Sequence, residues 1–351
     1  MNNPAMNNPA MSDPVLRIEG LRVRFSTRRG PLLAVSGVSL ALEANEVVGI
    51  VGESGSGKTL TGLSVLGLEP PGAAVSGHVW FRGEDLRSAS NRRLQEVRGA
   101  SIAMIFQEPM TALNPSLTVG SQVGEVVRRH QGLSRQATRA RVLDLFELVR
   151  LPGGARHLHS YPHQLSGGMR QRVMIAMAIA CDPAVLIADE PTTALDPTIQ
   201  AQILGLLRDL RATLGMAVLL ITHNLAVVRG FADRVLVMYA GHLLEEAPTD
   251  GLYATPGHPY TAGLLGAVPR PDSDRDTRPL TPIPGQVPLL QGEPEHCVFS
   301  PRCPYVEPRC LTAQNFQRGV DGCHDAPRTL AVLAAERRQR GPARRFLGRG
   351  P

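Results

Sequence analysis

One segment, GESGSGKT at residues 52–59, constrains the fold of this chain more than any other part of its sequence. Its spacing, G-x-x-x-x-G-K-T, is that of a loop whose backbone wraps around phosphate groups. The residues before it, EVVGIV, are apolar and β-branched as in a buried parallel strand, and LTGLSVLGL after it has apolar positions at near-helical spacing. Strand, glycine loop and helix together predict an α/β fold that binds a nucleoside triphosphate.

The residues of this loop have distinct expected roles. Its glycines let the backbone turn N–H groups toward a polyphosphate, and the N-terminus of the following helix favours negative charge. Lys58 is expected to reach the β and γ phosphates, and the Thr59 hydroxyl is expected to bind Mg²⁺. The alternative, a glycine-rich turn with an incidental lysine, is disfavoured by the flanking strand and helix. The nucleotide-binding residues expected here are Gly52, Ser54, Gly55, Ser56, Gly57, Lys58, Thr59 and Leu60.

A second chemical motif, AVLIADE at residues 184–190, places a buried strand directly before two acids. An acid at the end of a strand beside the phosphate loop holds Mg²⁺ through water, which is the role expected of Asp189. The next acid, Glu190, is expected to polarise the water that attacks the γ-phosphate. The alternative is a pair of acids that only caps the next helix.

Strand and helix patterns alternate along most of the chain. Strands are predicted at residues 15–25, 35–43, 46–51, 77–82, 100–106, 184–190 and 217–224, with a hairpin at 234–246. Helices are predicted within 118–151, from 166 onward and at 199–215. This alternation predicts a parallel sheet with helices on both faces. Hydrophobic residues make up 43% of the chain, enough for the sizeable core that such a sheet requires.

The composition changes beyond Ala254, where proline becomes dense and periodicity is lost. We therefore predict a disordered tail at 1–12, an ATPase domain at 13–250, a small extension at 251–330 and a basic tail at 331–351. The formal charge is +6, and six arginines lie between Arg337 and Arg349. No apolar run approaches the about 20 residues that cross a bilayer, so the chain is expected to meet a membrane only through a partner.

Four of the five cysteines cluster near the C-terminus with the spacing C-x₅-C-x₆-C-x₁₂-C. They are Cys297, Cys303, Cys310 and Cys323. A cytosolic chain disfavours disulfides, so the cluster predicts a metal or iron–sulfur site. Zinc sites usually contain a pair of cysteines separated by two to four residues. Because such a pair is lacking, an iron–sulfur cluster is favoured over zinc, with unligated thiols as the third alternative.

The segment LSGGMRQR at residues 165–172 makes the chain resemble the ATP-binding-cassette (ABC) ATPases. The chain also has the phosphate loop, Gln107 after a strand, ADE at 188–190, ALD at 194–196 and His223 after a strand, in the order of that family. The resemblance implies a RecA-like core, an antiparallel β subdomain and a helical subdomain. It also implies two cassettes that close head to tail, so that each ATP lies between one phosphate loop and the other signature.

Residue roles follow from this resemblance. Gln107 is expected to sense Mg²⁺ and the membrane subunits, His223 to contact the γ-phosphate, and Phe25 to stack on adenine, although a strand-end Phe is often only a core residue. The signature residues expected to meet the nucleotide are Ser166, Gly167, Gly168 and Gln171. The N–H groups at the start of a helix suit a γ-phosphate.

Finer features resemble one subgroup, the ATPase subunits of bacterial oligopeptide and dipeptide importers. GESGSGKT, IFQEPMTALNP, HNLAVV and GHPYTAGLL carry this resemblance, which covers roughly residues 13–327. Most members have serine where this chain has Thr59, and either hydroxyl binds Mg²⁺. In the subgroup the HPY segment opens a C-terminal extension, and in some relatives the cysteines that follow hold a 4Fe-4S cluster.

The subgroup also implies cofactors and partners. ATP and Mg²⁺ are the expected cofactors, with the 4Fe-4S cluster or zinc at the cysteines. The expected partners are a second ATPase subunit in a heterodimer, two permeases and an extracytoplasmic substrate-binding protein, without nucleic acid, at the cytoplasmic face of the inner membrane. Nickel or sugar cargo stays open, because other subunits select the cargo. A soluble cassette ATPase of translation or DNA repair is disfavoured by the single uninterrupted cassette.

Overall fold

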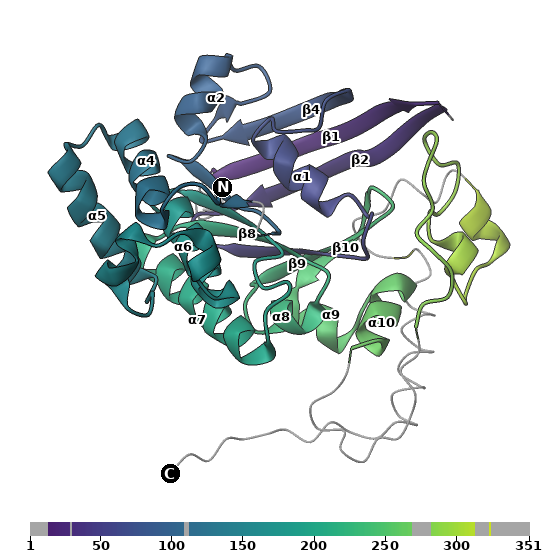
Figure 1. The fold of residues 1–351 in the computed structure, drawn as a ribbon. Helices are drawn as coiled ribbons and strands as arrows, with labels where there is room; N and C mark the ends of the chain where they lie inside the picture. Colours follow the sequence, from purple (N-terminus) through teal and green to yellow (C-terminus); the bar gives the residue numbers. More distant parts are fainter. Residues whose placement is uncertain (1–12, 29, 109–111, 269–281, 313–322, 324–351) are drawn as a thin grey trace, which may run out of the picture.

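The computed structural model describes residues 13–28, 30–108, 112–268, 282–312 and 323. A six-stranded sheet lies at the centre of the fold (Figure 1). Its strands are β3 (Val47–Val51), β6 (Ile102–Ile105), β7 (Val185–Asp189), β8 (Ala217–Thr222), β9 (Arg234–Tyr239) and β10 (His242–Pro248), in the order β10-β9-β3-β8-β7-β6. β3, β6, β7, β8 and β9 run parallel, and β10 pairs antiparallel with β9. The predicted parallel sheet and hairpin are therefore confirmed.

Both faces of this sheet are buried. In β8, Val218 and Leu220 belong to one hydrophobic cluster, whereas Leu219 and Ile221 belong to a second one. Successive side chains of a strand point to opposite faces, so a strand covered on both faces must be apolar at every position. The uninterrupted apolar runs in the sequence have this origin.

A second sheet is antiparallel and lies beside the first (Figure 1). It contains β1 (Leu16–Thr27), β2 (Gly30–Leu42), β4 (Ala73–Phe81) and β5 (Glu84–Asp85), in the order β2-β1-β4-β5. Helix α1 (Lys58–Val65) contacts β1 and β2 of this sheet and β7 and β8 of the parallel sheet. The glycine loop that precedes α1 is thus fixed between the two sheets. A short helix, α2 (Asn91–Val97), follows β5.

The helical part of the fold packs around α4 (Val119–Gln131), α5 (Arg135–Leu148) and α6 (Gly167–Ala178). The predicted helical segment at 118–151 is interrupted between the first two. Gly132 ends α4 in the left-handed region at a φ of 63°, and the Ser134 hydroxyl accepts a hydrogen bond from the N–H of Ala137 to begin α5. Two short 3₁₀ helices, η1 (Gly154–His159) and η2 (Pro162–Gln164), lead to α6.

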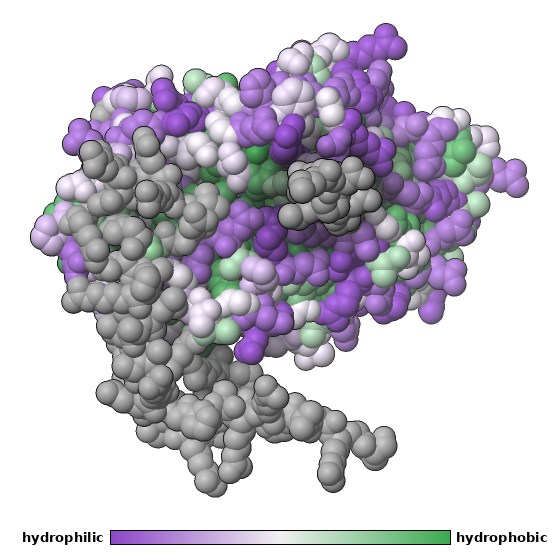
Figure 2. All heavy atoms as spheres, turned by 180° about the vertical axis from the view of Figure 1, so that it is seen from behind, coloured by the Kyte–Doolittle hydropathy of each residue, from purple (hydrophilic) through white to green (hydrophobic). Residues whose placement is uncertain are grey.

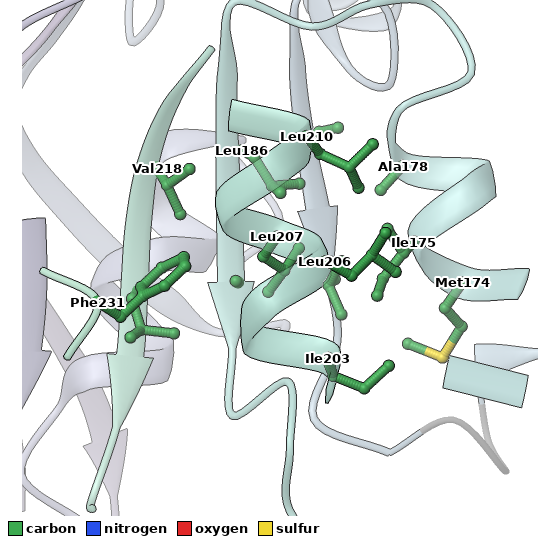
Figure 3. Packing of buried hydrophobic residues seen from close by; sticks show 14 of the residues in the cluster. Met174, Ile175, Ala178, Leu186, Ile203, Leu206, Leu207, Leu210, Val218 and Phe231 are labelled. Carbon is green, nitrogen blue, oxygen red and sulfur yellow. The ribbon is translucent and has the colours of Figure 1, made fainter. Parts of the chain in front are cut away.

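Helix α7 (Pro197–Leu214) joins the helical part to the parallel sheet. Asp196 caps its N-terminus by accepting a hydrogen bond from the N–H of Ile199. Figure 3 shows Ile203, Leu206, Leu207 and Leu210 of this helix, with Leu186 and Val218 of the sheet on one side and Met174, Ile175 and Ala178 of α6 on the other. This packing fixes the start of α6 relative to the strand ends.

The chain after β8 is more regular than its sequence predicts. Three short helices cover one side of the parallel sheet: α8 (Leu225–Arg229) between β8 and β9, and α9 (Thr249–Ala254) and α10 (Pro259–Gly266) after β10. His258 caps α10 through its ring Nδ1, which accepts a hydrogen bond from the N–H of Tyr260. This cap explains why α10 forms although its sequence has little helical periodicity. The predicted boundary between 13–250 and 251–330 stays a prediction, and the predicted tails at 1–12 and 331–351 lie outside the described residues.

Residues 282–312 form a compact segment beside the ends of β1 and β2 (Figure 1). The segment contains η3 (Ser300–Arg302) and η4 (Pro308–Leu311), and the N–H of Leu33 in β2 donates to the carbonyl of Leu290 over 2.8 Å. We call this segment, together with α10, the C-terminal extension. It therefore packs on the antiparallel sheet.

The surface in Figure 2 is mostly hydrophilic, and hydrophobic residues show there only as small areas between polar ones. Within the described ranges, every helix is too short or too polar to cross a membrane.

Candidate functional site

The candidate site lies where four neighbouring parallel strands end. The glycine loop follows β3, Asp189 ends β7 and is followed by Glu190, His223 follows β8, and Gln107 follows β6. Because β3, β8, β7 and β6 are adjacent in the sheet, their carboxyl ends bring these residues to one edge. Open α/β sheets bind their ligands at this edge.

The glycine loop has a backbone that larger residues could not adopt. Gly57 has a φ of 100°, and a Cβ there would lie 2.6 Å from the carbonyl oxygen of Ala34. Inside the loop, the ammonium of Lys58 donates to the carbonyl oxygens of Gly52 and Glu53, each over 2.8 Å, and to the Ser56 hydroxyl over 3.2 Å. Lys58 is 6% exposed, and burial lowers its pKa, opposed by the nearby carboxylates Glu190, Asp189 and Glu53. The Lys58 ammonium is thus fixed by backbone carbonyls of its own loop.

Thr59 and Asp189 form a pair at the entrance to the loop. The Thr59 hydroxyl, which is exposed, donates to Asp189 Oδ1 over 3.1 Å. Burial, followed by the charge of the adjacent Glu190, raises the pKa of Asp189 to about 6, although the hydrogen bond from Thr59 and the charge of Lys58 act in the opposite direction. A hydroxyl and a buried carboxylate side by side are oxygen ligands of the kind that Mg²⁺ prefers. Two of the three residues predicted to bind magnesium, Thr59 and Asp189, are therefore in contact and chemically suited to the ion, and the third, Gln107, contacts Glu190.

Glu190 is the centre of a hydrogen-bond network. Its Oε1 lies 2.8 Å from Nδ1 of His223, and its Oε2 accepts hydrogen bonds from the Thr193 hydroxyl over 2.7 Å and from Nε2 of Gln107 over 3.3 Å. Burial alone would raise the pKa of Glu190, but the hydrogen bonds from His223 and Thr193 and the charge of Lys58 hold it below its usual range. Glu190 is therefore an ionised carboxylate at neutral pH.

The sequence predicts two residues of this network but not the third. Gln107 and His223 were both predicted at the site, and both contact Glu190. Thr193 was missed, although it lies three residues after Glu190, in the turn that the backbone enters with Glu190 at a φ of 46°. A turn of this kind brings the side chain three residues later close to the acid. A hydroxyl residue three positions after Glu190 is therefore the sequence signal that points to Thr193.

The signature residues lie at the start of α6. The Ser166 hydroxyl caps this helix by accepting a hydrogen bond from the N–H of Met169, and both Ser166 and Gly167 are exposed. Gly168 is close-packed, because a Cβ there would lie 2.9 Å from Ile199. Gln171 differs from these residues: it is 2% exposed, and its amide nitrogen has no hydrogen-bond partner among the described residues. The contacts predicted between these residues and a nucleotide stay predictions.

Phe25 in β1 and Leu60 in α1 are the remaining residues predicted to touch the nucleotide. Both are half-buried, and both pack against the hydrophobic cluster that the antiparallel sheet and α1 form with one face of the parallel sheet. The predicted stacking of Phe25 on adenine stays a prediction. Part of the Phe25 side chain is buried against the core.

The sequence also missed a contact from outside the nucleotide-binding part. Glu53, the second residue of the loop, forms an ion pair with Arg302 of the C-terminal extension, with Nη1–Oε2 and Nη2–Oε1 distances of 2.7 and 3.0 Å. The N–H of Glu53 also donates to the hydroxyl of Tyr260 in α10 over 2.9 Å. The partners lie 249 and 207 residues away in the chain, so no local pattern points to them.

Three of the four clustered cysteines, Cys297, Cys303 and Cys310, lie in the extension, and Cys323 follows it in the chain. The N–H of Cys297 donates to the carbonyl of Cys310 over 3.2 Å, and the N–H of Cys323 donates to the carbonyl of Gly257. Burial, with a smaller contribution from the charges of Cys297, Cys323 and Cys310, raises the pKa of Cys303 to about 11. Among the described residues, however, no three His, Cys, Asp or Glu side chains are arranged to hold a metal ion. The predicted iron–sulfur or zinc site thus lacks support from the structure.

The parallel sheet, the glycine loop and the paired acids define a phosphate-loop nucleotide-binding domain. Comparison with known families narrows this class. A family model described as ABC transporter matches residues 35–193, and one described as the oligopeptide/dipeptide transporter C-terminal region matches residues 244–310.

Individual relatives agree with these models. The dipeptide transport ATP-binding protein DppD of Bacillus subtilis is 50% identical over 291 residues, which cover 82% of this chain and 86% of that one. DppD of Escherichia coli is 48% identical over 296 residues, which cover 84% and 90%. Among solved structures, the bacterial ABC transporter cassette MJ0796, described as dimeric, has a TM-score of 0.60 at 29% identity, covering 67% of this chain and 98% of that one. The chain therefore belongs to the ATP-binding proteins of the ABC transporter family, which confirms the predicted family and fold class.

Proposed function

We propose that this edge of the sheet binds and hydrolyses ATP. The loop glycines and Ser54, Ser56 and Leu60 present N–H groups to the phosphates, and Lys58 neutralises the β and γ oxygens. When bound, Mg²⁺ supplies charge neutralisation to the phosphates. Thr59 and Asp189 would hold the ion, with Gln107 beside them.

The observation that carries the catalytic part of the proposal is the network around Glu190. An ionised carboxylate fixed by three donors accepts a proton from water without first reorganising. We assign Glu190 to this role: as the water oxygen forms a bond to the γ-phosphorus, the bond from that phosphorus to the β–γ bridging oxygen breaks, and ADP leaves. His223 orients Glu190 and faces the γ-phosphate.

Lys58→Ala tests the binding part of this assignment. Titration with a fluorescent ATP analogue should show a large loss of affinity, because an ammonium inside the phosphate loop is removed. The matched control is Arg93→Gln, which removes a cation that pairs with Glu84 at the surface. Equal affinity of Lys58→Ala and wild type would exclude the assignment.

We further propose that hydrolysis powers the import of di- or oligopeptides. The names of the DppD relatives and the match of the extension to an oligopeptide/dipeptide transporter region support this cargo. ATP would close two cassettes and move two permease subunits between access states at the cytoplasmic face of the membrane, while an extracytoplasmic binding protein delivers the peptide. Nickel or a sugar is the alternative cargo.

The cargo is tested with the assembled transporter in detergent. ATP hydrolysis should rise when the binding protein carries a peptide, and it should not respond to nickel or to sugars. Stimulation by nickel or a sugar alone would replace the peptide assignment.

We propose that the active form contains two cassettes, with Ser166 and Gly167 of one facing the phosphate loop of the other and with the more buried Gly168 and Gln171 behind them in the same helix. The exposed start of α6 and the dimeric form described for the MJ0796 cassette support this arrangement. We expect the second cassette to be a different chain. The purified subunit alone should then hydrolyse ATP slowly, with a rate that depends on its concentration, and rapid turnover independent of concentration would contradict the proposal.

We also propose that the four clustered thiols bind a 4Fe-4S cluster. What supports it is the sequence, in which four of the five cysteines gather near the C-terminus without the closely spaced pair that is usual for zinc. Protein purified without oxygen should absorb near about 400 nm and contain about four irons per chain. Replacing Cys303 with Ser should bleach it. Colourless protein with one zinc per chain would favour zinc, and protein without either metal would reject both.

A further inference from the structure

The phosphate loop is held from outside by two side chains of the C-terminal extension. Arg302 grips the Glu53 carboxylate with two nearly parallel hydrogen bonds of 2.7 and 3.0 Å, and the Tyr260 hydroxyl accepts a hydrogen bond from the Glu53 N–H over 2.9 Å. Glu53 is thus fixed at both its side chain and its backbone. Two-pronged pairs of arginine and carboxylate are the geometrically most specific ion pairs in proteins.

Arg302 is itself held rigidly, so it acts as a fixed support. Its side chain is 5% exposed. Beyond Glu53, its guanidinium donates to the carbonyls of Pro284 over 2.7 Å and Ile283 over 3.2 Å, and to the hydroxyl of Tyr239 over 3.3 Å. With the two bonds to Glu53, these contacts use all five N–H donors of the guanidinium. Any other position of the side chain would break several of these hydrogen bonds.

Aromatic packing joins this support to the parallel sheet. Tyr239 at the end of β9 lies 4.7 Å from Tyr260 and 5.4 Å from Phe299, measured between ring centroids, and Tyr260 lies 5.3 Å from Phe299. Tyr239 and Tyr260 are completely buried, and Phe299 is 1% exposed. Ring pairs at these separations stabilise beyond their buried area. The extension therefore contacts the sheet and the loop as one unit.

Glu53 connects this support to the residue that meets the phosphates. Its carbonyl oxygen accepts a hydrogen bond from Lys58 over 2.8 Å and another from the N–H of Ser56 over 3.3 Å. A shift of the Glu53 peptide would therefore move Lys58 and the backbone turn that presents N–H groups. The loop also contains three glycines at positive φ, residues 52, 55 and 57, which lower its intrinsic rigidity. A loop of this kind gains order from an external support.

We propose that Arg302 and Tyr260 are positioning residues for ATP binding, and that the C-terminal extension sets the affinity of the phosphate loop by fixing Glu53. The proposal rests on ATP binding at the loop, and it assigns the extension a direct effect on the nucleotide site. Without the ion pair, the loop also adopts arrangements in which Lys58 and the backbone N–H groups no longer point to one phosphate position. Only the remaining fraction of molecules binds ATP, so the apparent Kd rises.

A double-mutant cycle on ATP affinity tests this. The full chain carrying Arg302→Gln, Glu53→Gln or both is titrated with a fluorescent ATP analogue and Mg²⁺. Arg302→Gln should raise Kd at least about fivefold, the lower range of measured couplings between sites. Because both variants remove the same pair, the double variant should bind no more weakly than the weaker single one. Amide hydrogen exchange at residues 52–57 should accelerate in all three.

A matched control comes from another contact of the same extension. Glu293 pairs with Arg22 and Arg24 of β1 and accepts a hydrogen bond from the Ser36 hydroxyl of β2, so its partners belong to the antiparallel sheet and not to the phosphate loop itself. Glu293→Gln weakens the attachment of the extension without touching Glu53, so its Kd for ATP should stay within about twofold of wild type.

Tyr260→Phe provides a variant that keeps the buried ring and removes only the hydroxyl. It should raise Kd by about two- to threefold, because one neutral hydrogen bond to the loop is lost. If Arg302→Gln fails to fold, this variant decides the question. The proposal is overturned if Tyr260→Phe or a folded Arg302→Gln binds ATP like wild type, if Glu293→Gln weakens binding as much as Arg302→Gln, or if the cycle is additive. Failure of wild type itself to bind ATP would instead reject the proposed function.

Discussion

Replacing Glu190 with Gln separates catalysis from binding at this site. The amide keeps the size of the side chain and still accepts from His223 or Thr193, but it no longer takes a proton from water. A general base contributes about 10²- to 10⁴-fold to a rate, which corresponds to about 3–5 kcal/mol of transition-state stabilisation at 1.36 kcal/mol per factor of ten. Turnover should fall by that amount, while the Kd for ATP stays within about threefold of wild type.

A graded variant at the same carboxylate serves as the comparison. Thr193→Val removes one hydrogen bond to Glu190 but leaves the carboxylate in place, so turnover should fall less than about tenfold. The lost hydrogen bond is one that lowers the pKa of Glu190. Without it the pKa rises, and the loss of activity on the acid side should begin at a higher pH than in wild type.

Phosphate release by the assembled transporter at saturating ATP measures both effects, and binding of the fluorescent analogue gives the affinities. The Gln variant should also trap a closed pair of cassettes. Hydrolysis by Glu190→Gln within threefold of wild type would refute the assignment of Glu190 as the base.

Three further predictions test the ion site, the loop and the core. Burial raises the pKa of Asp189 from its usual 3.8 to about 6, so between these pH values the nucleotide-free folded state holds a proton that the unfolded state has lost. The free energy of unfolding should therefore fall as pH rises from about 4 to 6, by at most about 3 kcal/mol. Denaturant titrations should show that Asp189→Asn removes this pH dependence. Gly57→Ala should abolish ATP binding, because its Cβ would meet the Ala34 carbonyl at 2.6 Å and its φ is 100°, and binding like wild type would contradict this. Leu206→Ala should lower the free energy of unfolding by about 2–5 kcal/mol, because Leu206 is buried at the centre of the packing in Figure 3, and a loss under 1 kcal/mol in denaturant would contradict it.

The sequence predicts the nucleotide-binding part of the fold well, because the signals there are local. The strand, loop and helix around Lys58 are adjacent in the chain, and each pattern reports one element. Asn45, in the turn before β3, has a φ of 58°, a conformation that asparagine tolerates better than most residues. Once the parallel order of strands is known, Asp189 and His223 must reach the same edge as Lys58.

The C-terminal extension is where the sequence predicts least. Its proline-rich composition hides α10, whose start depends on a histidine cap and on the buried Glu245, which accepts hydrogen bonds from the N–H groups of Gly257 and His258. The pairing of Arg302 with Glu53 is also invisible in the sequence, because it depends on how the extension packs on the parallel sheet. Long-range contacts of this kind leave no periodic trace.

Uptake of a labelled dipeptide into vesicles tests the central claim most directly. The vesicles contain this chain, its partner ATPase and the permeases, with ATP trapped inside and the loaded binding protein outside. Wild type should accumulate the peptide only with ATP, and Glu190→Gln should show no uptake above background. Peptide uptake that is independent of ATP, or that is unchanged by Glu190→Gln, would contradict the account.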